Sequence, residues 1–235
     1  MRTGVKKYEL VSETTTAPNG ATLRRIRALR DIEVFGVKKG DFGGFVESES
    51  NLSHDDNAWV GSNAKVYGPA RVICDALVDG TSKVCGISFI RDNAVVTGKA
   101  YCENVFVENA ALVSENACLL NSRVVDSAVV KGNASIRYAR VYEQATVSGD
   151  LQSYFNLLSF GSNARIDNIS QFMTLRMPED NHSAYCIYRD SDGAFWFELL
   201  DVFGCERFTF DQMLERDRAL CDFAVERLSK THDAD

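Results

Sequence analysis

The amino-acid sequence predicts an all-β solenoid, because a unit of about six residues recurs through the central part of the chain. Each unit places a small residue, usually alanine, two positions before an aliphatic one, with a turn-forming residue in front. Residues two apart on a strand point to the same side, so both would face a shared interior. One unit buries little alone, and a stack of units builds the core. The aliphatic positions form a single predicted core column: Val60, Val66, Val72, Val78, Val84, Ile90, Val96, Cys102, Val107, Val113, Leu119, Val124, Val130, Ile136, Val141 and Val147.

The spacing of the small residues predicts that three units make one turn. These positions advance by six residues from Ala58 to Ala100 and by five to Val105, and the five-residue step returns before Ser122 and Ala139. A residue lost at every third corner indicates a three-sided coil, and we therefore expect a left-handed parallel β-helix. A sandwich of short alternating strands is the alternative, but it offers no reason for the periodic loss.

Residues 1–50 are predicted to form a small N-terminal β cap. Two alternating runs, 7–11 and 23–28, flank a Pro-Asn-Gly turn, and residues 32–37 are a third candidate strand. A glycine-rich segment, 40–47, would then cross the open end of the coil, with Phe42 and Phe45 plugging its hydrophobic axis. Such a cap is needed because a terminal rung otherwise exposes both its core and an unpaired strand edge.

The coil is expected to span 51–178, and residues 179–235 to form a C-terminal cap. Two strands, 184–189 and 195–200, are predicted to form a hairpin around Asp192-Gly193. Thr209 followed by Gln212 is a capping-box pattern, which predicts a helix that continues to about Leu228. The last clear repeat unit, 163–166, precedes this cap. Between 154 and 160 the unit fits poorly, which predicts a bulge at a corner.

At the corners, asparagine and glycine are the expected residues with positive φ, because both tolerate this conformation. The turn asparagines are Asn57, Asn63, Asn93, Asn116 and Asn133.

Composition narrows the classes of function. The 235 residues carry a net charge of −7, which argues against a general nucleic-acid binder but permits a local basic patch. Seven cysteines occur without a CxxC pair, and this pattern predicts a reduced, cytoplasmic protein. No apolar run approaches the ~20 residues of a membrane-spanning helix, so no membrane partner is expected. His182 and Cys186 are too few ligands for a metal site, and none is predicted.

If three units make a turn, every third outward position stacks on one face. The first face then carries an apolar column, the first-face stripe, formed by Trp59, Leu77, Val95, Leu112 and Val129. A stripe of this length should not stay in water. We expect it to lie in a homo-oligomer interface, a dimer or trimer, or to dock beneath the C-terminal helix.

The second face carries a mostly polar column, with Lys65, Lys83, Tyr101, Cys118, Ser135 and Gln152. The third face mixes arginine with phenylalanine: Arg71, Phe89, Phe106, Arg123 and Arg140, with Arg91 close by. Spaced guanidinium groups beside aromatic rings could bind phosphate or single-stranded nucleic acid. The alternative is that each arginine stem packs on a neighbouring ring and its head stays in water.

Candidate catalytic residues are scarce. The histidines are His54, His182 and His232, and only His54 is near the coil. It precedes Val60 by six residues, so the repeat phase points it toward the coil axis beneath the cap, where a structural role is expected. A general base must instead reach a substrate and be free to take its proton.

The repeats resemble the hexapeptide-repeat superfamily. The basic N-terminal hairpin, the glycine-rich segment 40–49 and the tandem Asn-Ala-x-Val units resemble uncharacterised bacterial and bacteriophage proteins of this fold, often labelled transferases. Many superfamily members are acyltransferases that use acetyl-CoA and a histidine base at a subunit interface. The resemblance implies a β-helix and a bacteriophage origin, but the transferase label rests on fold alone.

The sequence thus favours a non-catalytic, rigid scaffold or binding protein that associates with itself and, in a phage setting, binds a host protein. No cofactor is expected. A CoA-dependent acyltransferase with His54 as base is the first alternative, and acetyl-CoA would be its cofactor. Phosphate or nucleic-acid binding through the third face is the second alternative.

Overall fold

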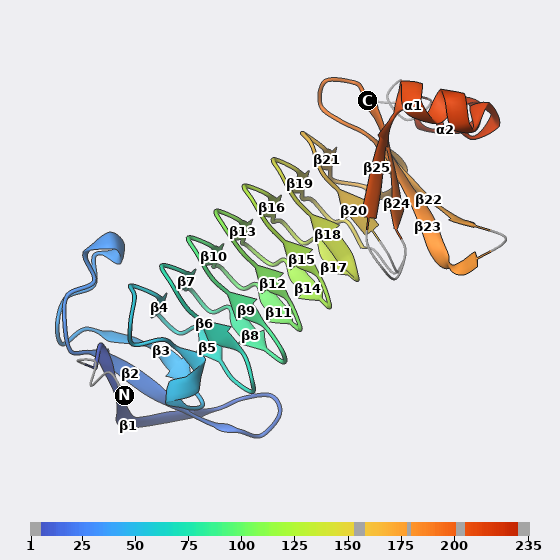
Figure 1. Ribbon diagram of the computed structural model, residues 1–235. Coiled ribbons are helices and arrows are strands. Elements are labelled where there is room, and N and C mark those ends of the chain that lie inside the picture. The colour runs from blue at the N-terminus through green and yellow to red at the C-terminus, as the bar shows by residue number, and fades with distance from the viewer. Residues whose placement is uncertain (1–5, 153–157, 178–179, 201–204, 230–235) are drawn as a thin grey trace.

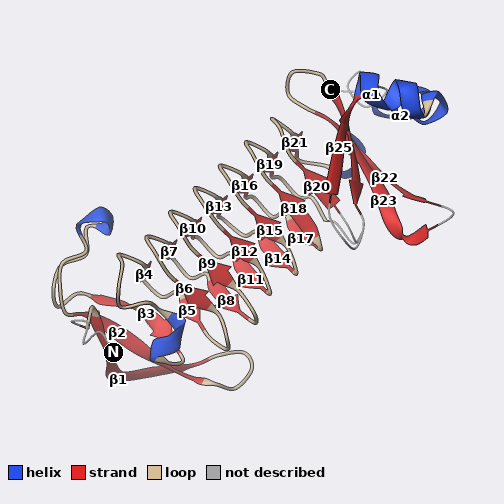
Figure 2. Ribbon diagram, in the orientation of Figure 1, coloured by secondary structure: helices blue, strands red, loops and turns tan. Residues whose placement is uncertain are grey.

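The computed structural model describes residues 6–152, 158–177, 180–200 and 205–229, which form a rod with a sheet at each end (Figure 1). Three parallel sheets make the faces of the rod, and the chain visits them in turn (Figure 2). The predicted parallel β-helix is therefore confirmed.

The first face is a seven-stranded parallel sheet within the described chain. Its residue pairs include Val60 with Val78 and Val78 with Val96, so the predicted ladder of stacked rungs is confirmed. Its strands are β4 (Trp59–Val60), β7 (Leu77–Val78), β10 (Val95–Val96), β13 (Leu112–Val113), β16 (Val129–Val130), β19 (Thr146–Val147) and β21 (Arg165–Ile166).

The second face continues directly from the N-terminal hairpin. Strands β1 (Tyr8–Thr16), β2 (Thr22–Ala28) and β3 (Phe42–Val46) pair antiparallel in that order, and β3 then pairs parallel with β5. The other strands of this face are β5 (Lys65–Val66), β8 (Lys83–Cys85), β11 (Tyr101–Glu103), β14 (Cys118–Leu120) and β17 (Ser135–Arg137).

The third face has six described strands, and β20 is its last rung. Residues 154–157 of the predicted bulge lie outside the described residues. The strands are β6 (Arg71–Val72), β9 (Phe89–Ile90), β12 (Phe106–Val107), β15 (Arg123–Val124), β18 (Ala139–Val141) and β20 (Leu158–Phe160).

The core lies along the rod axis and follows the predicted column. Every one of its aliphatic residues from Val60 to Val147, and Cys102 with them, has a relative exposure of 0%. Burying a valine fully contributes about 1.5–3 kcal/mol, so the stacked column stabilises the rod along its length.

The corners differ in detail from the prediction. Glycine takes positive φ at several corners, as expected, but at Asn63, Asn93 and Asn116 the positive φ falls on the preceding residue, as at Asp92 (φ 59°). The asparagine side chains instead bond along the stack: Asn116 Nδ2 donates to Asn133 Oδ1 at 2.8 Å, and Asn133 Nδ2 to Asp150 Oδ1 at 2.6 Å. Their amides therefore satisfy one another from rung to rung, and another residue takes the left-handed conformation.

The N-terminal cap closes the axis with other residues than predicted. Tyr8, Ile26, Ile32 and Leu52 join the central core, whereas Phe45 packs in a separate cluster with Tyr67 and Phe42 is 55% exposed. The expected strand at 32–37 is a single bridge around the 3-10 helix η1 (Glu33–Phe35), and η2 (Glu49–Asn51) follows β3. The phenylalanine prediction was wrong because β3 belongs to the second face, where these rings point outward.

Lys7 is a buried charge in this cap. Its Nζ donates to the carbonyl oxygens of Asp56 at 2.9 Å and Ala58 at 2.6 Å. These bonds satisfy acceptors at the end of the solenoid that no further rung covers.

A four-stranded antiparallel sheet forms the other end. Its strands are β22 (Phe172–Met177), β23 (Asp180–Arg189), β24 (Phe195–Leu200) and β25 (Cys205–Thr209), preceded by η3 (Ile169–Gln171). The predicted hairpin is present as β23 and β24. Thr209 does cap a helix, but the helix breaks at Asp217 into α1 (Phe210–Arg216) and α2 (Arg218–Ser229). Both helices pack on this sheet, so the C-terminal helix does not cover the first-face stripe.

Candidate ligand groove on the third face

The third face presents two neighbouring columns of outward side chains. Parallel pairing stacks the predicted set, from Arg71 through Phe89, Phe106 and Arg123 to Arg140. The structure therefore brings these residues onto one face, as expected. Phe89 and Phe106 stack with ring centroids 5.6 Å apart and planes at 10°, and they form a flat aromatic step.

The second column consists of the residues that directly follow the inward residue of each strand. It contains Glu108, whose carboxylate is buried. Arg91 Nε contacts one oxygen of Glu108 at 2.6 Å, and Arg123 Nη2 donates to the other at 2.6 Å. Two of the predicted anion-binding arginines are thus already paired. Sequence reasoning missed this clamp because Glu108 precedes a turn and carries no signal of its partners.

Arg140 differs from these two arginines. Its side chain is exposed, and within the described part of the chain no group forms a hydrogen bond or ion pair with it. Its charge is close enough to the Cys205 thiol to influence it. Arg140 is therefore a cation that a ligand could engage without breaking an existing ion pair.

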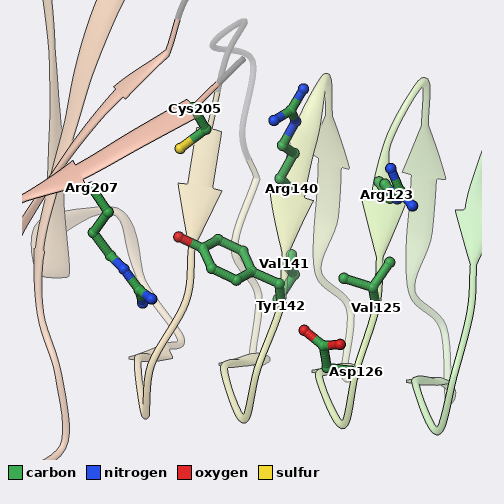
Figure 3. Close-up of a pocket in the computed structure, with 8 residues that line it drawn as sticks. All are labelled: Arg123, Val125, Asp126, Arg140, Val141, Tyr142, Cys205 and Arg207. Carbon is green, nitrogen blue, oxygen red and sulfur yellow. The ribbon is translucent and has the colours of Figure 1, made fainter.

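Two adjoining cavities make the third face a groove, and each is about 400 Å³. The first contains Phe89, Phe106 and the Glu108 clamp. The second lies between the rod and the C-terminal sheet, with Arg140 on one side and Cys205 and Arg207 on the other (Figure 3). Arg123 lines both cavities, so the two adjoin at this side chain, with the aromatic step on one side of it and the wall formed by β25 on the other.

Arg207 fixes this wall to the rod. It bonds both carboxylate oxygens of Glu143, at 2.8 and 2.6 Å, and its guanidinium lies 5.3 Å from the Tyr142 ring and 4.8 Å from the Trp196 ring. The bond to Glu143 raises the pKa of Arg207, and the same bond lowers the pKa of Glu143. The pair therefore stays charged, and it is a structural contact more than a free ligand site.

Beneath the second cavity is a buried polar network centred on Glu198. Its Oε1 accepts from the hydroxyls of Tyr188 at 2.5 Å and Tyr142 at 2.6 Å, and its Oε2 accepts from the Cys205 thiol at 3.4 Å. Burial and the nearby Glu198 charge raise the pKa of Cys205 to about 11 and raise those of both tyrosines. Cys205 is thus a protonated donor at neutral pH, not a thiolate nucleophile.

His54 lies in the N-terminal cap, but the inward position that the repeat phase assigns to it is occupied by Leu52, which pairs with Val72. The His54 ring stacks on Tyr8 with centroids 4.2 Å apart, and its Nδ1 accepts the Lys7 N–H at 3.2 Å. Burial lowers the pKa of His54 and so favours the neutral ring, and because Nδ1 accepts the Lys7 N–H, the proton of that ring is on Nε2. A ring in this tautomer presents no free acceptor for a substrate proton. The side chain of His182 and all of His232 lie outside the described residues.

The first-face stripe is assembled as predicted. Leu77, Val95, Leu112 and Val129 form one ladder and are half-buried, while Trp59 is only 3% exposed beside the N-terminal cap. A cavity of about 640 Å³ at that end contains Trp59 and Leu77 together with Val34 and Phe42 of the cap.

Within the described residues, no three or more metal-ligating side chains lie together in a cluster. All seven cysteines are free. Of the helices described, none has the length and apolarity to cross a membrane. No protein-family model matches the chain, and no curated protein matches its sequence.

Proposed function

We propose that the protein is a non-catalytic binding protein whose rigid solenoid holds a protein segment in the groove on its third face. The adjacency of the two cavities carries the proposal. An aromatic step at Phe89 and Phe106 adjoins, across Arg123, a second cavity that contains the exposed cation Arg140. The rungs below are fixed by a fully buried core, so the groove is preorganised and a ligand loses little affinity to ordering it.

The chemistry of the groove defines its ligand. The aromatic step suits an apolar side chain, and the guanidinium of Arg140 suits a carboxylate through paired hydrogen bonds. Phe106 and Arg140 lie two rungs apart, which is roughly 10 Å at ~4.8 Å per rung. An extended peptide rises about 3.3 Å per residue, so the acidic residue should follow or precede the apolar one by two to four positions.

A protein segment suits the charges better than nucleic acid does. Glu108 already pairs with Arg91 and Arg123 and cancels one of their two positive charges, and the whole chain carries −7. A polyanion needs several free cations along its path, because each phosphate contact adds to affinity. Among the arginines of this face, the structure leaves Arg71 and Arg140 without a described ion-pair partner, and they lie four rungs apart.

The position of His54 supports the non-catalytic part of the proposal, because its free nitrogen carries the proton and the ring lies in the cap, away from the groove. The seven free cysteines favour a reducing compartment such as the cytoplasm. In the bacteriophage setting that the sequence resemblance implies, the partner would be a host protein.

Selection from a random peptide display library on the intact protein tests this proposal. We expect enriched peptides that place an aspartate or glutamate two to four residues from an aromatic or aliphatic residue. Arg140→Gln should weaken their binding about tenfold, the effect of losing one charge-assisted contact. Arg137→Gln, at an exposed arginine on the second face, is the matched control and should change nothing.

Two further measurements separate the alternatives. Salt-dependent binding of a thymidine 20-mer that falls on Arg140→Gln would replace the proposal with nucleic-acid binding. Calorimetric binding of acetyl-CoA, with an acyl-transfer activity lost on His54→Ala, would replace it with catalysis. Failure to enrich any peptide that depends on Arg140 would also overturn it.

A further inference from the structure

The first face differs from the other two in its apolar column and in the charges beside it. Each strand of this face has a second outward position, directly after its inward residue. These positions stack as Asp79, Thr97, Ser114, Lys131 and Ser148, since each backbone N–H bonds the carbonyl of the rung above. Asp79 belongs to the rung of Leu77, and Lys131 to the rung of Val129. Neither forms an ion pair within the described chain.

We propose that this face binds a second copy of the chain in an antiparallel, two-fold symmetric dimer. The inference goes beyond the proposed function, because it concerns the first face and not the third, and it does not require a ligand in the groove. The accessible part of the first-face stripe runs from Leu77 to Val129, and its midpoint lies between Val95 and Leu112. Asp79 and Lys131 are equidistant from that same midpoint, one on either side.

A two-fold axis through this midpoint, lying across the rod, turns the charges into complementary pairs. It places Leu77 of one copy opposite Val129 of the other, and Val95 opposite Leu112. Because the axis keeps each column facing itself, Asp79 lies opposite Lys131 of the second copy, and the symmetry repeats the pair. The apolar residues would then be covered by equivalents of similar size, with one opposite-charge pair at each end.

A parallel dimer, with its axis along the rod, is disfavoured by the same charges. That axis keeps each rung opposite the same rung of the second copy, but it reverses the order of the residues across the face. Asp79 would then meet Asp75 of the second copy, because Asp75 precedes the small residue on the same rung. Like charges placed opposite each other oppose association.

The N-terminal cap extends the apolar surface. Val34 is 62% exposed and Phe42 is 55% exposed, and both line the cavity that contains Trp59 and Leu77. Figure 1 shows the loop between β2 and β3, which carries Val34, projecting beside β4. A stable interface usually buries roughly 800 Å² per partner, which is more than four narrow rungs supply. In the antiparallel arrangement, the rungs of Thr146 and Arg165 from the second copy come to this loop and enlarge the contact.

Sedimentation equilibrium of the full chain tests the inference through charge reversal. We expect a dimer for the wild type, and a dissociation constant roughly 10-fold to 100-fold weaker for either Asp79→Lys or Lys131→Asp, since each places like charges opposite one another twice. The double variant Asp79→Lys/Lys131→Asp should regain most of the wild-type affinity. Lys99→Asp makes the same charge change at an exposed lysine beyond this face and should leave the dimer intact.

Lys131 is exposed and Asp79 is half-buried, and neither belongs to the hydrophobic core, so these variants test association without removing core packing, and unchanged melting temperatures verify this. Replacing Val95 and Leu112 by lysine should abolish the dimer altogether. A wild-type monomer at 100 µM, or a trimer, would overturn the inference. So would a stronger dimer in Asp79→Lys, because only the parallel arrangement gains from removing that aspartate.

Discussion

Gly98→Ala should destabilise the protein much more than Gly20→Ala, because only Gly98 is packed against another rung. Both glycines have positive φ, 72° and 86°. A Cβ at Gly98 would lie 2.7 Å from both the backbone nitrogen and the backbone oxygen of Glu115, whereas one at Gly20 would meet nothing within 4 Å. The left-handed conformation costs an alanine about 1–2 kcal/mol at either position.

The difference in unfolding free energy between the two variants isolates the cost of the contact with the next rung. Overpacking against backbone adds about 1–3 kcal/mol at Gly98 alone, which gives a difference of about 2 kcal/mol. For a chain of this size, that difference lowers the melting temperature of Gly98→Ala by a further 4–8 °C or so. Thermal unfolding followed by circular dichroism measures it. Equal losses in the two variants would refute the close stacking of this corner on the next rung.

Three other predictions concern buried and paired charges. Burial lowers the pKa of Lys7 from 10.5 to about 8, so between these pH values the folded protein binds fewer protons than the unfolded chain. The free energy of unfolding of the wild type, relative to that of Lys7→Met, should therefore rise with pH across this window by on the order of 3 kcal/mol, as measured by denaturant unfolding. If the difference between the two proteins does not change with pH, Lys7 is not buried as described. Tyr142→Phe removes one donor to the buried Glu198 and should cost about 1.5–3 kcal/mol of unfolding free energy, whereas no loss would show that the network does not fasten the C-terminal sheet. Glu108→Gln releases Arg91 and Arg123, so binding of a thymidine 20-mer at low salt should increase about several-fold; unchanged binding would mean that Glu108 does not mask this face.

The repeat made the rod predictable from the sequence. A strict two-residue offset between Ala58 and Val60, and its recurrence, determines which side chains face inward. The loss of one residue at every third corner, as before Val105, reveals the number of faces. Together these features predicted the stacking of the first-face stripe and of Phe89 on Phe106, because register in a parallel ladder follows from the period alone.

The chemistry of the groove was not predictable in the same way. Tyr142 and Glu198 are 56 residues apart, on the rod and on the cap, and no local pattern links them. The Glu108 clamp depends on which rotamers bring Arg91 and Arg123 to one carboxylate, and a repeat phase says nothing about rotamers. Phe45 was misplaced because β3 continues the second face in register: Val46 is the inward residue stacked on Val66, and Phe45 lies beside the outward Lys65.

Photo-crosslinking tests the use of the third face most directly. Benzoylphenylalanine would replace Phe106 on this face or, as a matched control, Tyr101 on the second face of the rod. Each protein would be irradiated with a peptide selected on the wild type. The account predicts a peptide adduct at position 106 and none at position 101. Equal adducts at both positions, or an adduct at position 101 alone, would contradict it.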